Sequence, residues 1–243
     1  MIGFSLPLSP SQFIEFLKPY VSARVFSSGT YHKPNPISNA YGLSILSELN
    51  LVDSADIIDL LDIEMFLENE LTLFIPEKLI LNFYTLVALK MLEKRGNIIT
   101  DKNNLLKELV SLDVTTFSDK NIPFDMMCHL ASIKLIEATR DVTRLKQSYY
   151  IELTKSLRQN GSINNNLTDT ARALLVLDLL ELDHSNEDLS RILIAFIKKN
   201  NKFFDDSYSS SAFHWNNDPL AFKVELRMLF WVCLALSFYE NMV

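Results

Sequence analysis

The chain has 243 residues, with 23 Lys and Arg against 30 Asp and Glu, a net charge of −7 and a hydrophobic fraction of 48%. This composition excludes a disordered or fibrous chain, and its 5 Gly and 8 Pro leave too few turns for an all-β fold, so we expect one compact domain over residues 1–243. Nucleic-acid binding is also not expected, because it needs a basic surface and this chain has no Lys or Arg cluster.

Apolar residues recur at three- and four-residue spacing along most of the chain, which predicts an all-α protein. The first helix is expected to follow Ser9, a suitable N-cap, with Pro10 at its first position. An extended segment over 24–38 comes next, because Gly29, Pro34 and Pro36 interrupt the helical pattern. The ten predicted helices cover 9–23, 39–51, 54–70, 77–95, 101–113, 124–139, 143–158, 168–182, 186–200 and 219–240.

Every second helix is predicted to be apolar on nearly all sides, and these helices share one sequence frame. Their anchor residues are 43, 44, 43 and 55 positions apart, and they are Leu43, Leu86, Leu130, Ala173 and Met228. A period of this size indicates a structural repeat. The intervening helices are amphipathic, so each repeat is expected to be a hairpin of one inner and one outer helix. Five hairpins form an open array or a closed ring, and the ring buries the inner helices better.

The fourth repeat carries the clearest motif, Arg158-Gln-Asn-Gly-Ser-Ile followed by Leu167-Thr-Asp-Thr-Ala-Arg-Ala-Leu-Leu-Val-Leu. It resembles the repeat of the α/α toroids in the prenyltransferase and terpenoid-cyclase superfamily. In that family an outer helix ends in a QNxDGS turn and an inner helix opens with a threonine-bearing DTAxALLAL run. The segments that begin at Asn39 and Asn82 are looser copies. The resemblance implies an α/α toroid of about five hairpins.

The family's catalytic motifs do not occur in this sequence. The missing motifs are the Asp-x-Asp-Asp acid of the cyclases, their Gln-Trp repeat signature, the Asp-x-Cys zinc pair of the protein prenyltransferases and the Cys-Gly-Glu-Gln thioester of the complement-type toroids. The chain is therefore similar to a degenerate member of the superfamily, and a shared fold does not transfer an activity.

Cys128 and His129 form a candidate metal pair, because thiolate and imidazole are zinc ligands. The lanthionine-forming cyclases, another α/α-toroid family, use a Cys-His pair with a second Cys, which here would be Cys233. Neighbouring residues point about 100° apart on a helix, so they share an ion only near a helix end. The alternative is an ordinary buried thiol beside a polar ring, without a metal or other cofactor.

Polar residues at the starts of the inner helices form a second group of candidates. In a closed ring these starts gather at one mouth, where helix dipoles favour an anion. In the alternative interpretation the Asn and Asp side chains are N-caps and each Arg pairs with a neighbouring carboxylate. The residues of this group are Asn39, Asn82, Asp125, Asp169, Arg172, Glu225 and Arg227.

Aromatic side chains form the third group. The long loop over 203–217 contains His214 and Trp215, and a loop of this kind is a lid or a binding loop, or it plugs the end of a repeat array. The segment 24–36, with Phe26 and His32, has the same two interpretations. The inner-helix aromatics line an apolar cavity or fill a dry core, and they are Tyr41, Phe83, Tyr84, Phe230 and Trp231.

Three functions remain open. The first is a toroid without catalytic motifs that binds an apolar or isoprenoid-like molecule, or a peptide, at the ring mouth. The others are a non-catalytic helical-repeat scaffold for another protein and an enzyme like the prenyltransferases or terpene cyclases. The candidate ligand-binding residues are Tyr84, Asp125, Asp169, Arg172, His214, Trp215, Glu225 and Arg227.

The cysteine pattern and the hydropathy predict the location of the chain. The two Cys residues are far apart within apolar stretches, as is usual for free thiols in a reducing compartment. The most apolar run, 228–236, is half the length of a membrane span, and the first residues lack the features of a secretory signal. A cytoplasmic protein without a transmembrane segment is therefore expected.

Overall fold

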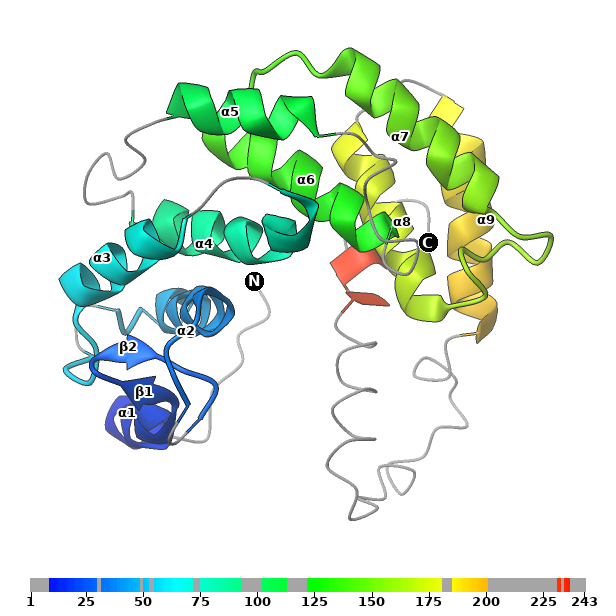
Figure 1. Ribbon diagram of the computed structural model, residues 1–243. Coiled ribbons are helices and arrows are strands. Elements are labelled where there is room, and N and C mark those ends of the chain that lie inside the picture. The colour runs from blue at the N-terminus through cyan, green and yellow to red at the C-terminus, as the bar shows by residue number, and fades with distance from the viewer. Residues whose placement is uncertain are drawn as a thin grey trace, which may run out of the picture. The chain divides into compact units, whose positions relative to one another are not determined.

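The computed structural model describes residues 9–29, 32–48, 50–52, 55–71, 75–92, 102–112, 122–180, 185–200, 231–232 and 234–236. These residues form nine named α-helices and one antiparallel pair of two-residue strands (Figure 1). The predicted all-α class is therefore confirmed. The chain divides into two compact units, the first made of Met1–Leu112 and Ser132–Ala138 and the second of Asp113–Ala131 and Thr139–Val243. The prediction of one domain and of a closed ring stays a prediction.

The described helices follow the predicted order, and a short strand hairpin that was not predicted is added to them. The first unit contains α1 (Pro10–Leu17), η1 (Lys18–Tyr20), β1 (Val21–Ser22), β2 (Val25–Phe26), α2 (Pro36–Glu48), α3 (Leu60–Glu70), η2 (Pro76–Lys78), α4 (Leu79–Leu92) and α5 (Lys102–Ser111). The helix α6 (Ile122–Ile136) contributes to both units. The second unit contains α7 (Thr143–Ser156), α8 (Leu167–Leu180) and α9 (Ser185–Asn200).

The start of α1 confirms the predicted N-cap. The Ser9 hydroxyl accepts a hydrogen bond from the backbone N–H of Gln12, and the Gln12 side chain accepts one from the backbone N–H of Ser9. This reciprocal capping box satisfies two donors that a helix start otherwise leaves unpaired. Pro10 occupies the first helical position, where its missing N–H costs nothing.

The predicted position of the end of the first helix is wrong. The expected helix over 9–23 stops at Tyr20, and β1 and β2 form a tight antiparallel hairpin in which Val21 pairs with Phe26. Ala23 and Arg24 make its turn, with φ of 49° and 62°. A two-residue turn of this kind needs positive φ at both positions and normally shows Asn or Gly, so the sequence gives little sign of it.

Two further helix starts differ from the predicted positions. Helix α2 begins at Pro36, inside the segment expected to be extended, because proline is well suited to the first helical turn. Helix α3 begins at Leu60 and not near residue 54. The Asp59 carboxylate caps α3 by accepting hydrogen bonds from the backbone N–H groups of Leu61 at 2.9 Å and Asp62 at 3.4 Å.

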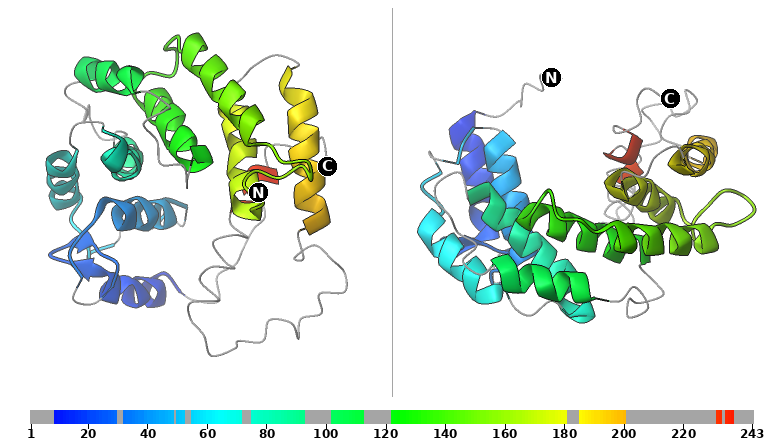
Figure 2. Two further views of the ribbon diagram at one scale, coloured as in Figure 1. Left: turned by 45° about the vertical axis from the view of Figure 1, so that its right-hand side comes forward. Right: turned by 90° about the horizontal axis from the view of Figure 1, so that it is seen from above.

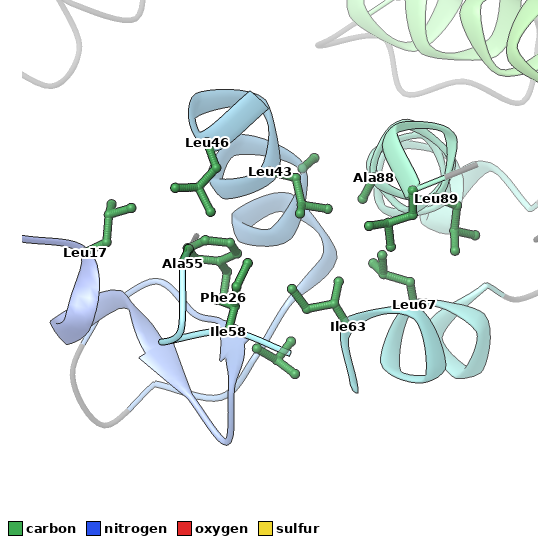
Figure 3. Close-up of a cluster of buried hydrophobic side chains, with 13 residues drawn as sticks. Leu17, Phe26, Leu43, Leu46, Ala55, Ile58, Ile63, Leu67, Ala88 and Leu89 are labelled. Carbon is green, nitrogen blue, oxygen red and sulfur yellow. The ribbon is translucent and has the colours of Figure 1, made fainter. Parts of the chain in front are cut away.

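The core of the first unit lies between α2, α3, α4 and the strand hairpin. Figure 3 shows Leu43 of α2, Leu67 of α3 and Leu89 of α4 around one apolar cluster, which also contains Phe26 of β2. Helix α4 contacts both α2 and α3. Helices α2, α3 and α4 therefore pack around one core within this unit, and the repeat of helical hairpins stays a prediction.

Hydrogen bonds of Asn39 and packing of Phe26 hold the segment before α2 against that helix. The fully buried Asn39 amide accepts a hydrogen bond from the Phe26 N–H and donates one to the Phe26 carbonyl oxygen, both at 3.1 Å. The Phe26 ring lies directly against Gly42 of α2, where a Cβ atom would be 2.5 Å from the ring. The Phe26 ring therefore packs in the core of the first unit, and the Asn39 side chain stabilises this packing.

The second unit surrounds α8 with neighbouring helices. Ten of the 14 residues of α8 are buried, as expected for an inner helix that is apolar on nearly all sides. Helix α8 contacts both α7 and α9, and Figure 2 shows these three helices from two further directions. The amphipathic α7 and α9 have the character predicted for outer helices.

The turn between α7 and α8 contains the Gln-Asn-Gly-Ser motif. Gly161 has a φ of +83°, and a Cβ atom there would be 3.2 Å from the side chain of Ile192 in α9. The Thr170 hydroxyl accepts a hydrogen bond from the backbone N–H of Ile163 at 3.0 Å and donates one to the Asn166 carbonyl oxygen at 2.7 Å. The glycine and the threonine of the motif therefore fix the turn and the first residues of α8.

Candidate functional site

The structure brings three candidate residues together at the starts of α6 and α8. Asp125 lies in the first turn of α6, Asp169 in the first turn of α8, and Arg172 one turn after Asp169. All three are buried, with exposed fractions of 7%, 7% and 5%. The structure places these three side chains near one another, while the predicted gathering of all inner-helix starts at one ring mouth stays a prediction. We call Asp125, Asp169 and Arg172 with the rings of Phe124 and Trp231 the charged cluster.

Two aromatic rings hold the Arg172 side chain in place. Its guanidinium carbon lies 4.4 Å from the centre of the Phe124 ring and 5.0 Å from that of the Trp231 ring. The two rings meet edge to face, with centres 5.5 Å apart and planes at 70°. A desolvated cation on an aromatic face gains about 2 kcal/mol. Arg172 is therefore a fixed positive charge.

The ion pair between Arg172 and Asp169 is long. The Nη1 atom of Arg172 is 3.6 Å from the Oδ1 atom of Asp169, which is an attraction between charges without a direct hydrogen bond. The other carboxyl oxygen of Asp169 accepts a hydrogen bond from the Asn164 side chain at 3.4 Å. Its own backbone N–H donates to the Asn166 side chain, which caps α8. Asp169 therefore combines a structural role with a charge next to Arg172.

The Asp125 carboxyl is the second acidic group of the charged cluster. No hydrogen-bond donor reaches its carboxyl among the residues that the structure describes. Burial raises the pKa of this carboxyl from 3.8 to about 6, although the positive charge of Arg172 acts in the opposite direction. A raised pKa means that the fold destabilises the charged form of Asp125. A donor from a ligand would complete its hydrogen bonding.

The charges of the charged cluster do not balance when both carboxyls are ionised. Asp125 and Asp169 carry two negative charges and Arg172 carries one positive charge, so these three side chains sum to −1. Protonation of Asp125 brings the sum to zero. The arrangement therefore favours a proton, a hydrogen-bond donor or a cation over an anion at the Asp125 carboxyl.

Cys128 and His129 follow Asp125 on α6 but have different surroundings. Burial, with a smaller effect from the charge of Asp125, raises the pKa of the Cys128 thiol well above 9.0, so the uncharged thiol dominates at neutral pH. The His129 Nδ1 atom forms a buried hydrogen bond with the Tyr149 hydroxyl of α7. Within the described part of the chain, no three Cys, His, Asp or Glu side chains group as a metal site would require. Zinc binding by Cys128 and His129 stays a prediction.

Tyr84 belongs to the first unit and contacts other aromatic side chains there. Its hydroxyl is hydrogen-bonded to that of Tyr41 at 3.0 Å, and the two ring centres are 5.6 Å apart. The Tyr41 side chain keeps 47% of its surface exposed, and Ile45, one turn along α2, keeps 42%. Helix α2 is therefore not apolar and buried on all sides as predicted, and α2 and α4 present an aromatic surface.

Six candidate residues lie outside the described residues, and they are His214, Trp215, Glu225, Arg227, Phe230 and Cys233. Three residues with clear structural roles were not candidates. Phe124 precedes Asp125 directly, and an aromatic residue beside an acidic one at the start of an apolar helix is a usable signal. Tyr149 and Leu153 are the fully buried positions of α7, and their four-residue spacing on an otherwise polar helix marks its inward face.

Comparison with known proteins gives no relative. No protein-family model matches the sequence, and no curated protein or solved structure is significantly similar to it. In the part of the chain that the structure covers, no helix combines the length and the hydropathy needed to cross a bilayer.

Proposed function

We propose that the chain is a binding protein with the architecture of a prenyltransferase-like α/α toroid, and that it holds a peptide at the starts of its inner helices. The alternation of inner and outer helices within each unit and the turn before α8 support the architecture. The absence of the superfamily's catalytic motifs from the sequence supports a non-catalytic role. A cytoplasmic location is part of this proposal.

The observation that carries the proposal is the buried Asp125 carboxyl, which lacks a hydrogen-bond donor among the described residues beside the fixed charge of Arg172. Buried polar groups are normally paired, and a group left unsatisfied costs about 1–3 kcal/mol. A ligand with N–H groups would recover that cost. A peptide offers N–H donors together with apolar side chains for the surrounding aromatic rings.

The same electrostatics disfavour a prenyl diphosphate at this position. A diphosphate would bring further negative charges next to Asp125 and Asp169, and only Arg172 would oppose them among the described members of the charged cluster. The dipoles of the helix starts favour an anion, but the negative charges of the two carboxyl groups outweigh this effect. A peptide is the better candidate.

A second candidate function is the binding of an apolar, isoprenoid-like ligand on the aromatic surface of α2 and α4. The exposed Tyr41 and Ile45 and the neighbouring Tyr84 support it, because exposed apolar side chains on adjacent helices form a binding surface for hydrocarbon. This candidate uses the first unit and not the charged cluster.

Nuclear magnetic resonance can test whether the charged cluster binds a peptide. The indole N–H signal of Trp231, assigned with Trp231→Phe, reports on the charged cluster. We expect members of a synthetic decapeptide library to shift this signal, and we expect farnesyl diphosphate not to shift it. If farnesyl diphosphate shifts the signal, Arg172→Gln abolishes this shift and no peptide is active, then the ligand of the charged cluster is an isoprenoid and not a peptide. If neither probe shifts the signal, the proposed site is wrong.

A further inference from the structure

Asp125 combines three properties that point to the chemical class of its ligand. The residue is only 7% exposed, its carboxyl lacks a hydrogen-bond donor among the described residues, and its ionised form leaves the charged cluster with one excess negative charge. Arg172 does not neutralise both carboxyls, because Asp169 already lies 3.6 Å from its Nη1 atom. A single additional positive charge would balance the three side chains.

We infer that the Asp125 carboxylate receives the cationic end of a basic side chain of the ligand, and that this contact replaces a proton. The inference rests on the proposed function and adds to it the class of ligand residue and a dependence on pH. When the cation binds, protonated Asp125 releases its proton to solvent and forms a charge-assisted hydrogen bond with the ligand. No covalent bond changes in this exchange.

The aromatic rings of the charged cluster already hold a cation, because the Arg172 guanidinium lies over both Phe124 and Trp231. Among the described residues, the titratable or charged side chains that interact with Asp125 or with its neighbours in the charged cluster are Arg172 and Asp169 from α8 and Cys128 from α6. Cys128 remains an uncharged thiol at neutral pH, so it does not compete with Asp125 for the cation.

The expected pH dependence follows from competition between the proton and the ligand cation. With a pKa of about 6, about one tenth of the Asp125 carboxyls are ionised at pH 5.0 and nearly all are ionised at pH 7.5. Apparent affinity scales with the fraction of the competent form. The ligand cation should therefore bind about tenfold more weakly at pH 5.0 than at pH 7.5.

Three probes with the same alkyl chain test the inference, namely n-hexylammonium, n-hexanol and hexanoate. They are titrated into the full chain while the Trp231 indole signal is followed. We expect n-hexylammonium to bind at least tenfold more tightly than the other two probes at pH 7.5, and to lose this advantage at pH 5.0. The variant Asp125→Asn should bind all three probes equally. The control variant Asp188→Asn, which removes an exposed carboxyl from the first turn of α9, should behave like the unmodified chain.

The outcomes separate this inference from the proposed function. If peptides shift the Trp231 signal but n-hexylammonium has no advantage over n-hexanol, the proposed function stands and the inference is wrong. The inference is also wrong if Asp125→Asn retains the preference for n-hexylammonium. If neither peptides nor n-hexylammonium affect the signal, both proposals are wrong.

Discussion

Replacing Asp125 by asparagine should make the protein more stable at neutral pH. The amide has nearly the shape of the carboxylate but carries no charge, so the change removes a buried charge that lacks a hydrogen-bond donor among the described residues. Most substitutions at buried positions destabilise a protein. A gain in stability would therefore be a distinctive result.

The magnitude follows from the pKa of Asp125. Folding raises this pKa from 3.8 to about 6, and each pH unit corresponds to about 1.36 kcal/mol, so ionisation of Asp125 costs the folded state about 3 kcal/mol. The folded chain binds this proton more tightly than the unfolded chain, so protonation of Asp125 stabilises the folded state. This stabilisation is fully present below pH 3.8 and is lost as the pH rises through about 6.

Urea unfolding followed by circular dichroism measures the effect. The free energy of unfolding of Asp125→Asn should exceed that of the unmodified chain by about 3 kcal/mol at pH 7.5, and the difference should disappear as the pH approaches 3.8. Asp188→Asn, the exposed control, should change stability by less than about 0.5 kcal/mol. Equal or lower stability of Asp125→Asn at pH 7.5, or a difference that does not vary with pH, would refute the reasoning.

Two further substitutions test the packing that supports the two units. Gly42→Ala should lower the free energy of unfolding by about 1–2 kcal/mol in urea titrations, because the new Cβ atom would lie 2.5 Å from the buried Phe26 ring. Overpacking of this kind costs about 1–3 kcal/mol, which exceeds the gain of about 1 kcal/mol in helix propensity. Thr170→Val should cost about 1–3 kcal/mol in the same assay, because the buried N–H of Ile163 loses its acceptor.

Matched controls keep these two results specific. Ser47→Ala adds helix propensity at an exposed position of the same helix α2 and should not destabilise the protein. Thr154→Val removes an exposed hydroxyl that is bonded only to a carbonyl oxygen of its own helix, at 2.8 Å, and should change stability by less than about 0.5 kcal/mol. If Gly42→Ala is as stable as Ser47→Ala, this result would contradict the close contact between the Phe26 ring and Gly42 of α2.

The helical part of the fold was predictable because the apolar spacing is strong and local. The Ser9 cap and the inward position of α8 follow from residues that are neighbours in the sequence. The hairpin turn at Ala23 and Arg24 was not predictable, since both residues adopt positive φ without the usual Gly or Asn. The late start of α3 was also missed, because Ala55 and Ile58 are buried apolar residues outside a helix and imitate its pattern.

The candidate site was predictable in its charges but not in its surroundings. Asp125, Asp169 and Arg172 were identified because helix starts with polar residues are visible in the sequence, and the structure brings them together. The ring contacts of Phe124 and Trp231 depend on packing between segments about a hundred residues apart. No local pattern encodes such a contact. The sequence therefore left an anion site and simple N-caps open, whereas the charges of the packed side chains are the basis for proposing a cation at Asp125.

The pKa of the Asp125 carboxyl in the ligand-free chain tests the account most directly. A titration by carbon-13 nuclear magnetic resonance, with the signal assigned by Asp125→Asn, measures it without any assumption about the ligand. We predict a value of about 6, which a buried carboxyl without a hydrogen-bond donor requires. A value at or below 3.8 would show that the carboxyl is already paired, and the charged cluster would then be a structural ion pair and not a binding site.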